Sequence, residues 1–395
     1  MTDSFGQGNS DVLVLKFDDA GALVWARVWG TALDESGAAI ALDSSDNVYV
    51  AGSIDQGSGA TDVLLLSFTG DGAFRWARAW DGGASGNDYA TGVALDSSDN
   101  VWVAGTVTVG DISFGTYSYP DLDMALLCFQ TDGTLTSAWT YGGSAVFLNT
   151  SEGVNSLALD GSGNPLLAGW HASFDLSGAV YVNACVVKAS ASTGALLWAR
   201  EVAVTGMQGA ALDVACGPSG DVYVCGVEAS DLTNPTADAS ATLCKYNSSG
   251  SLQFARVWTE SSTSVESFAS VAVSSAGSDV YVVGTIGDGS ASGELLLVRW
   301  TDAGSALAAQ KWSVAGVVVG GAAVALYGDS PICVGNSGSV GGAWSNVFGD
   351  AAASGTASSF TLLLTSRATT TTTPAGQVET PTAAAGGGTD VLIIR

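Results

Sequence analysis

Side chains that could act as acids, bases or nucleophiles are few and scattered in this chain. His171 is the only histidine among 395 residues, so an imidazole could serve as a general base or metal ligand at one place only. The glycine-rich stretches are expected to be turns, because no helical pattern follows them to bind a phosphate. The sequence contains no serine nucleophile elbow, P-loop or HExxH helix. We therefore expect no enzyme activity and assign no catalytic residue.

Calcium is the one cofactor that the sequence leaves open. Aspartates recur in turns that read Asp-Ser-Ser-Asp-Asn, and the weak candidate ligands are Asp43, Asp46, Asp96 and Asp99. These turns lack the alternating D-x-D-x-D-G spacing and the distal glutamate that wrap a calcium ion. Aspartate and asparagine also suit tight turns, because their side chains bond to their own backbone. Turn formation is the preferred interpretation, and calcium binding is the alternative.

These turns belong to an internal repeat, which is the strongest signal in the sequence. One half of the repeat reads AIALDSSDNVYVAG at 39–52 and GVALDSSDNVWVAG at 92–105. The other half reads DVLVLKFDDAGALVWARVWG at 11–30 and DVLLLSFTGDGAFRWARAW at 62–80. Each half consists of two β-rich runs around a turn, which is the pattern of a hairpin. Two hairpins per repeat predict a four-stranded sheet.

Repeated four-stranded sheets predict an all-β fold, a β-propeller of antiparallel blades. Copies of the first half end at Gly52, Gly105, Gly169, Gly226, Gly284 and Gly335. These six copies indicate six blades, with seven as the alternative. We expect the propeller to span residues 1–367, with the N-terminal hairpin 11–30 completing the last blade and closing the ring. A further strand-like run at 359–366 has no place in this count.

The combination of the Trp-Ala-Arg strand with the Asp-Ser-Ser-Asp-Asn turn resembles the bacterial β-propeller repeat called SBBP. The resemblance covers roughly residues 11–335, and it is clear in the first two copies and degraded in the last two. It implies a propeller, often found within larger surface or secreted bacterial proteins. It implies no catalytic residues, because the motif is structural.

Large rings recur on the fourth strand of the repeat. They are Trp25, Trp76, Trp139 and Trp198, with Phe254 at the matching place. Rings at a fixed repeat position can fill the widening gap between radial blades, and each buries on the order of 150–250 Å². Arginines near these rings, such as Arg27 and Arg78, are expected to stack on them. An aromatic platform for sugar binding is the alternative interpretation.

Charge and cysteine content limit the partners and the compartment. The chain has 38 acidic and 12 basic residues, for a net charge of −26, so it should repel nucleic acids and anionic membranes. No run approaches the ~20 apolar residues of a membrane span. Most of the six cysteines replace apolar residues of the repeat and are expected to be buried thiols, with Cys216 and Cys225 as the pair best placed for a bridge.

Acidic residues also precede the first strand of successive repeats, namely Asp34, Asp88, Glu152 and Glu266. They could form an acidic rim at one end of the central channel. A cation site there is one interpretation, and solvated loop entries are the preferred one.

The composition changes abruptly after residue 367. Residues 368–388 are rich in Thr, Pro, Ala and Gly and are expected to form a linker, and residues 389–395 read TDVLIIR, a copy of TDVLLL at 61–66. An isolated strand has unpaired backbone groups and should seek a sheet edge. We expect this strand to join another molecule, with return to its own propeller or a truncated blade as alternatives. The candidate assembly strand consists of Thr389, Asp390, Val391, Leu392, Ile393, Ile394 and Arg395.

These observations favour a non-catalytic structural or interaction scaffold, assembling head to tail through its C-terminal strand. The expected partners are copies of the chain or other proteins, through strand addition. The expected location is extracellular or at a cell surface, although the first residues lack the pattern of a signal peptide. A ligand-binding propeller, lectin-like or calcium-binding, is the alternative, and a propeller hydrolase or lyase comes third.

Overall fold

A computed structural model describes most of the chain, and every regular element within the described residues is a β-strand. No helix among these residues is long and apolar enough to span a membrane. The described residues are 10–20, 22–57, 59–114, 117–143, 149–174, 180–203, 207–232, 239–259, 264–287, 293–313, 319–337, 343–347, 358–361, 364–368, 377–379 and 390–394.

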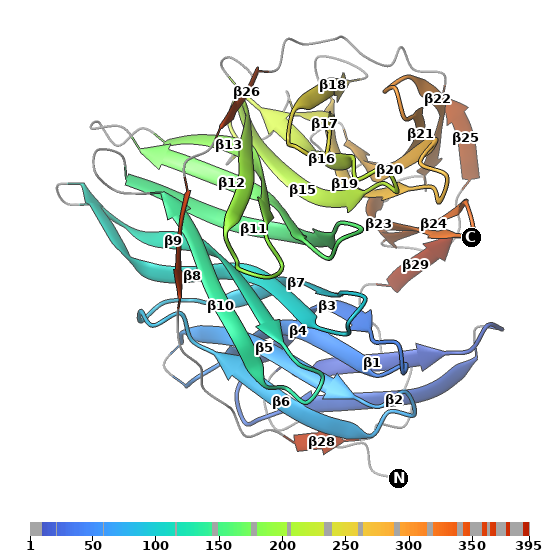
Figure 1. Ribbon diagram of the computed structural model, residues 1–395. Coiled ribbons are helices and arrows are strands. Elements are labelled where there is room, and N and C mark those ends of the chain that lie inside the picture. The colour runs from blue at the N-terminus through green and yellow to red at the C-terminus, as the bar shows by residue number, and fades with distance from the viewer. Residues whose placement is uncertain are drawn as a thin grey trace.

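Five complete four-stranded antiparallel blades follow one another around an arc (Figure 1), which confirms the all-β fold of repeated sheets. The blades are β3 (Glu35–Leu42), β4 (Val48–Asp55), β5 (Thr61–Phe68) and β6 (Phe74–Trp80); β7 (Tyr89–Leu95), β8 (Val101–Phe114), β9 (Tyr117–Phe129) and β10 (Leu135–Gly143); β11 (Asn149–Leu159), β12 (Pro165–Phe174), β13 (Val180–Ala189) and β14 (Leu196–Ala203); β15 (Gln208–Cys216), β16 (Val222–Ala229), β17 (Ser240–Tyr246) and β18 (Leu252–Trp258); and β19 (Val265–Val273), β20 (Asp279–Gly287), β21 (Gly293–Thr301) and β22 (Ala306–Ser313).

Two further hairpins supply the strands of a sixth blade, but they do not join. The first hairpin is β1 (Val12–Phe17) and β2 (Leu23–Gly30), and the second is β23 (Val319–Tyr327) and β24 (Ser330–Ser337). Among the described residues, β24 pairs with β29 (Asp390–Ile394) and β1 pairs only with β2, so the expected pairing of β1 with β24 is not seen there. The arrangement is consistent with a six-bladed propeller whose ring is left open.

The remaining C-terminal strands extend existing sheets at their outer edges. β25 (Ala343–Val347), β26 (Ser358–Thr361) and β27 (Leu364–Ala368) pair with β22, β14 and β10 respectively. The strand-like run at 359–366 thus adds fifth strands instead of starting a new blade, and its residues 362–363 lie outside the described part. The expected linker contains a strand as well, β28 (Gln377–Glu379), which pairs with β2.

Short turns of one kind form one end of the blades. Thr69 and Gly72 close the β5–β6 turn, with Gly72 N–H donating to Thr69 O at 2.8 Å. The residue that ends such a turn adopts the left-handed region, which glycine enters without strain. The Asp-Ser-Ser-Asp-Asn turns follow the same geometry with Asp46 and Asp99 in that region (φ 63° and 58°), where later copies have Gly163 and Gly220.

The rings of the Trp-Ala-Arg strands pack between neighbouring blades. Trp76 Nε1 donates to Thr131 O of the next blade at 3.1 Å, and Arg78 Nε donates to Gly133 O at 2.7 Å. The Arg78 guanidinium also lies over the Trp76 ring, 5.1 Å from its centroid. A Cβ at Gly133 would approach the Trp76 ring to 2.8 Å, so only glycine leaves room for this contact. The same contacts recur at Trp25 with Arg27 and at Trp198 with Arg200. Phe254 has no ring N–H, and there only the arginine bond and the stacking of Arg256 recur.

Trp139 does not occupy the position expected from the repeat. Trp139 pairs with Leu126 of β9, and at this register the β3–β6 blade has Arg78, which pairs with Leu65. The residue of β10 that matches Trp76 is Ser137. The ring nevertheless stacks on Trp102, with centroids 6.1 Å apart. It also reaches the turn glycine of the next blade, because a Cβ at Gly194 would lie 1.9 Å from the ring. One side chain thus fills the space that a tryptophan and an arginine share elsewhere.

All six cysteines carry free thiols, and five of them are buried. Cys216 is half-buried and pairs with Val222 across its hairpin, whereas Cys225 pairs with Asp213. The two residues are therefore not cross-strand partners, and both carry free thiols, in keeping with the expectation of buried thiols for most of the six.

Candidate functional site: an open blade edge and a layer of buried acids

The face of β1 that points away from the β3–β6 blade is apolar and exposed. Leu13, Leu15 and Phe17 are 55%, 43% and 52% exposed. Their counterparts one blade later, Leu64, Leu66 and Phe68, are 1%, 0% and 0% exposed, because the β1–β2 hairpin covers them. In contrast, Val12 and Val14 on the other face of β1 are buried against β3–β6. The difference arises because nothing in the described structure takes the place of the preceding blade.

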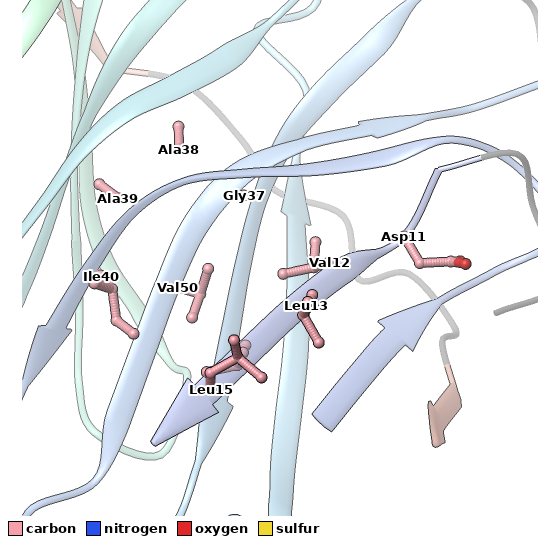
Figure 2. A pocket seen from close by; sticks show the side chains of 10 residues that line it. Asp11, Val12, Leu13, Leu15, Gly37, Ala38, Ala39, Ile40 and Val50 are labelled. Atoms are coloured by element: carbon pink, nitrogen blue, oxygen red, sulfur yellow. The ribbon is translucent and has the colours of Figure 1, made fainter. Parts of the chain in front are cut away.

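A groove lies between β1 and the inner strands of the next blade (Figure 2). Its first part, of about 350 Å³, is lined by Asp11, by Val12 to Leu15 of β1, by Gly37 to Ile40 of β3 and by Val50 of β4. A second part, of about 530 Å³, continues past Phe17 and Leu42. Ile40 and Leu42 are 58% and 56% exposed here. In a complete blade the first two strands occupy the equivalent position beside the third strand. The groove therefore lies where a hairpin of two inner strands would pack, and its lining is mostly apolar.

Three of the acidic residues expected at loop entries are buried, and two of them, Glu152 and Glu266, lie within β11 and β19; this corrects the expectation of solvated loop entries. Asp88, Glu152 and Glu266 are 1%, 0% and 0% exposed. In the β3–β6 blade the matching acidic residue is Glu35 and not the expected Asp34. Glu35 pairs with Ile54, and this pair has the same register as Glu152 with His171 in the β11–β14 blade. These carboxyl groups therefore form a buried layer at the end of the blades where the first strands begin.

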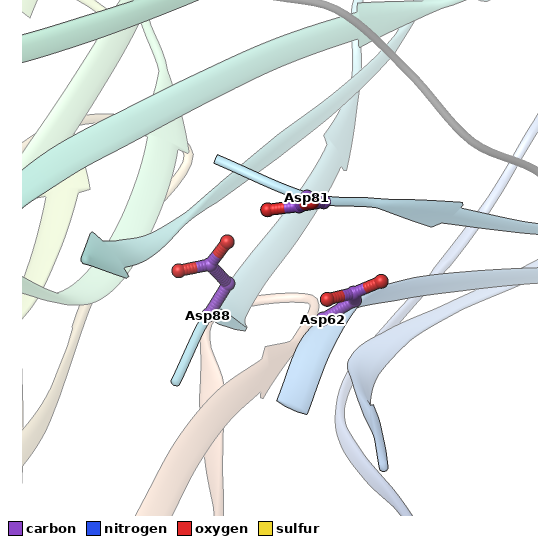
Figure 3. Close-up of side chains that lie close together, drawn as sticks. All are labelled: Asp62, Asp81 and Asp88. Carbon is purple, nitrogen blue, oxygen red and sulfur yellow. The ribbon is translucent and has the colours of Figure 1, made fainter. Parts of the chain in front are cut away.

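One member of this layer, Asp88, meets the half-buried Asp62 and the exposed Asp81 at the junction between the second and third sheets along the chain (Figure 3). Asp62 of β5, Asp81 after β6 and Asp88 before β7 each place an oxygen within 4.8 Å of the other two. Asp88 accepts hydrogen bonds from the backbone N–H groups of Gly82 (2.5 Å) and Thr108 (2.8 Å). Such a group of oxygens could share a proton or bind a divalent cation.

Burial changes the proton affinity of this layer. It raises the pKa of Asp88 to about 6, and the carboxylates of Asp81 and Asp62 add to the rise against the two N–H donors. Burial likewise raises the pKa of Glu152 to about 7, although His171 opposes the rise. Burial also raises the pKa of Glu35. Over a range of pH these carboxyl groups are therefore still protonated in the folded protein when they are already ionised in the unfolded chain.

We expect the protein to be more stable at pH 5 than at pH 7.5. Unfolded carboxyl groups titrate near pH 4, whereas Glu152 and Asp88 titrate at about 7 and about 6 when folded. Between these values the folded state binds more protons, so the free energy of unfolding falls as the pH rises. The shift of Glu152 alone corresponds to at most roughly 3 kcal/mol. Thermal unfolding from pH 4.5 to 8 measures the trend.

Two variants distinguish the effect of the buried carboxyl groups on the pH dependence of stability from the effect of the protein's overall negative charge. Glu152→Gln should flatten the slope between pH 5 and 7.5, because the amide does not titrate. Asp71→Asn changes an exposed carboxyl whose pKa is lowered by its bond to Thr69, and it should leave the slope unchanged. A melting temperature that rises from pH 5 to 7.5 would contradict the prediction.

His171 lies between two carboxylates at this same end of the blades. Its Nε2 is 3.5 Å from Glu152 Oε1, and its Nδ1 is 3.3 Å from Glu201 Oε1. Asn183 donates to the same oxygen of Glu201. Because each ring nitrogen faces an acidic neighbour from β11 or β14, the imidazole links strands of one blade.

The weak calcium candidates have structural contacts within their turns. Asp43 accepts hydrogen bonds from Asn47 N–H (2.8 Å) and Asn47 Nδ2 (2.8 Å). Asp96 makes the same contacts with its own asparagine, Asn100. Asp99 accepts from Ser44 N–H of the neighbouring blade at 3.0 Å. Asp43 and Asp96 thus stabilise their own turns, and Asp99 joins two neighbouring blades. Asp46 adopts the left-handed backbone conformation that the turn requires.

The candidate assembly strand pairs within its own chain. Residues 390–394 form β29 along the free edge of β24, with Leu392 opposite Gly335. Thr389 and Arg395 lie outside the described residues.

Sequence reasoning missed two parts of this site. Asp62 and Asp123 recur at the start of the DVLLL-type strand and face the acid of the next blade, and their recurrence was the available signal. A glycine makes the space for one of them, since a Cβ at Gly142 would lie 1.8 Å from Asp123 Oδ1. The exposed face of β1 was not foreseen, because the ring was expected to close over it.

Comparisons with known proteins give limited similarity. No protein-family model matches the chain. It is similar to the regulatory protein FlaEY of Caulobacter vibrioides, with 34% identity over 151 residues that cover 33% of this chain and only 16% of that protein. A solved structure of Trypanosoma rangeli sialidase in complex with sialic acid has 9% identity and a TM-score of 0.40, covering 86% of this chain and 56% of the sialidase chain. Over that third of its length the chain is thus a distant homologue of FlaEY, and its described residues form a β-propeller-like repeat of four-stranded antiparallel sheets.

Proposed function

We propose that the protein is a non-catalytic scaffold that joins copies of itself head to tail through the unpaired edge of β1. The observation that carries the proposal is the exposed apolar face of Leu13, Leu15 and Phe17 above a groove that lies where complete blades have their first two strands. Strand addition satisfies the backbone groups of such an edge and buries alternate side chains. On this proposal the repeat is of the SBBP type, and the scaffold works outside the cell or at its surface.

The contact is directional, which distinguishes a chain of copies from a closed dimer. One side of the ring opening offers the outer hairpin β1–β2, and the other side offers the inner hairpin β23–β24. Two different surfaces that meet head to tail generate filaments unless the rotation closes a ring. The net charge of −26 disfavours indiscriminate contact between copies.

Leu15→Lys should weaken self-association by about 10–100-fold. Full burial of one leucine contributes roughly 1.5–3 kcal/mol, which corresponds to about that range in the dissociation constant. Sedimentation velocity over a wide range of protein concentration measures the effect. The control is Leu197→Lys, because Leu197 is 51% exposed on the outer strand β14 and away from the groove.

Two results would count against this proposal. The wild-type protein should show concentration-dependent association, so a strict monomer at several hundred micromolar would contradict it. Equal effects of Leu15→Lys and Leu197→Lys would show that any association does not use the β1 edge.

Cation binding is a second candidate function, favoured by the three carboxylates of Asp62, Asp81 and Asp88. Oxygen ligands at this spacing suit calcium. Calorimetric calcium uptake by the wild-type protein that disappears in Asp88→Asn would favour this function, whereas heat that is unchanged in the variant would place binding elsewhere on the acidic surface.

A further inference from the structure

The edge of β24 accepts a strand in one defined register. In every complete blade the closing glycine of strand two faces the third residue of the Asp-Val-Leu type strand, as Gly52 faces Leu64 and Gly284 faces Leu296. Gly335 of β24 faces Leu392 of β29 in the same way, and Ser337 faces Asp390. β29 therefore occupies the third-strand position of a normal blade.

A second segment of the chain fits that position equally well. Residues 11–15 read DVLVL, and residues 390–394 read DVLII. Placed in the blade register, Leu13 would face Gly335 and Leu15 would face Cys333, the residue that now faces Ile394. Leu13 and Leu15 point to the face that the preceding blade covers elsewhere, and Cys333 is buried on that face beside Leu295 and Trp312.

The N-terminal hairpin would complete the blade, whereas β29 leaves it with three strands. β2 carries Trp25 and Arg27, which already contact the turn of the next blade at Gly70 and Gly72. With β23 and β24 it makes four strands, the number in each complete blade. The groove beside β1 is the space that β23 and β24 would enter.

We propose that β29 is a removable cap on the edge of β24, and that the strand it excludes is β1 of a second copy. This inference rests on the proposed function, since it names the surface of the second copy to which β1 binds. A strand tethered to its own chain has an effective concentration on the order of millimolar. At micromolar protein the cap thus competes effectively with a second copy, and its loss should strengthen assembly by about tenfold or more.

The test compares the full chain with a chain that lacks residues 389–395. The shortened chain should form oligomers larger than dimers at concentrations where the full chain is mostly monomeric, and added TDVLIIR peptide should reverse this. Ile393→Pro in the full chain is a second route to the same state, because proline removes a backbone donor from the strand that pairs with β24. Both proteins should retain the cooperative thermal unfolding of the blades.

A cysteine pair identifies the register and the partner. Leu15→Cys in the shortened chain should form a disulfide with Cys333 of another copy, seen as a ladder on a non-reducing gel. Leu13→Cys is the matched control, because its expected neighbour is Gly335, and it should cross-link far less.

The possible failures can be told apart. A disulfide within one chain would mean that β1 closes its own ring, and it would overturn head-to-tail docking. Weaker association of the shortened chain would mean that β29 itself joins the copies, which overturns the cap. If cap removal changes nothing while Leu15→Lys still weakens association, the cap inference fails and the proposed function stands.

Discussion

Replacing Gly105 with alanine is expected to destabilise the protein by about 3 kcal/mol or to prevent folding. Gly105 lies on β8 opposite Ala90, where the register shifts at a bulge in β7. A Cβ at Gly105 would lie 2.1 Å from the carbonyl oxygen of Tyr89. Backbone cannot rotate away as a side chain can, so the two inner strands must separate, at the upper end of the usual cost of overpacking.

The same contact recurs at the other closing glycines, which explains why the repeat ends as it does. A Cβ would lie within 2.3 Å of a backbone oxygen of the first strand at Gly52, Gly169, Gly226, Gly284 and Gly335. Bulges allow the first strand to bend close to its neighbour. The glycine is therefore a requirement of the blade and carries no chemistry.

Gly110→Ala is the matched control, because Gly110 lies on the same strand and a Cβ there would meet nothing within 4 Å. We expect this change to alter the free energy of unfolding by less than about 0.5 kcal/mol. Urea denaturation of both variants measures the difference. Similar losses for the two variants would show that glycine flexibility, and not the close approach at Gly105, determines the effect.

Trp76→Ala should destabilise the protein by about 3–5 kcal/mol. Trp76 is 9% exposed, and its ring contacts Tyr49, with centroids 5.9 Å apart. The substitution removes a large buried ring and leaves a cavity between two blades. It also removes the hydrogen bond to Thr131 O and the surface on which Arg78 stacks. The free energy of unfolding in denaturant is the measurement.

Trp76→Phe separates the ring from its N–H group. Phe254 already stands at the equivalent register opposite Lys245, and Arg256 stacks on it at 4.9 Å. A phenyl ring thus supports the same inter-blade contact, so Trp76→Phe should cost roughly 1–2 kcal/mol, near the value of one hydrogen bond plus a smaller ring. A loss below about 1 kcal/mol for Trp76→Ala would mean that these rings do not hold the blades together.

The sequence alone determined the repeat, the four-stranded blades and the turns. These features are local: two β-rich runs and a turn residue such as Gly72 or Asp46 fold as a hairpin wherever they occur. Stacking of Arg27 and Arg78 on neighbouring rings was also foreseen, since Trp-Ala-Arg puts both side chains on one face of a strand.

Only the tertiary structure decided the features that depend on residues far apart in the chain. Trp139 has the right residue type for the repeat, but its register places it where the β3–β6, β11–β14 and β15–β18 blades have Arg78, Arg200 and Arg256. The burial of Asp88 and Glu152 arises from blade packing, because each blade's acid is covered by strands of its neighbour. A pattern within one repeat contains neither kind of information.

The strand that pairs with β24 is the clearest example of a feature that only the tertiary structure decided. Residues 11–15 and 390–394 have almost the same sequence and fit the same register, so local preference cannot distinguish them. The outcome depends on loop closure, on the effective concentration of each strand and on what covers the face of Leu13 and Leu15. These are properties of the folded molecule and its neighbours, and they determine whether the sixth blade is capped or completed.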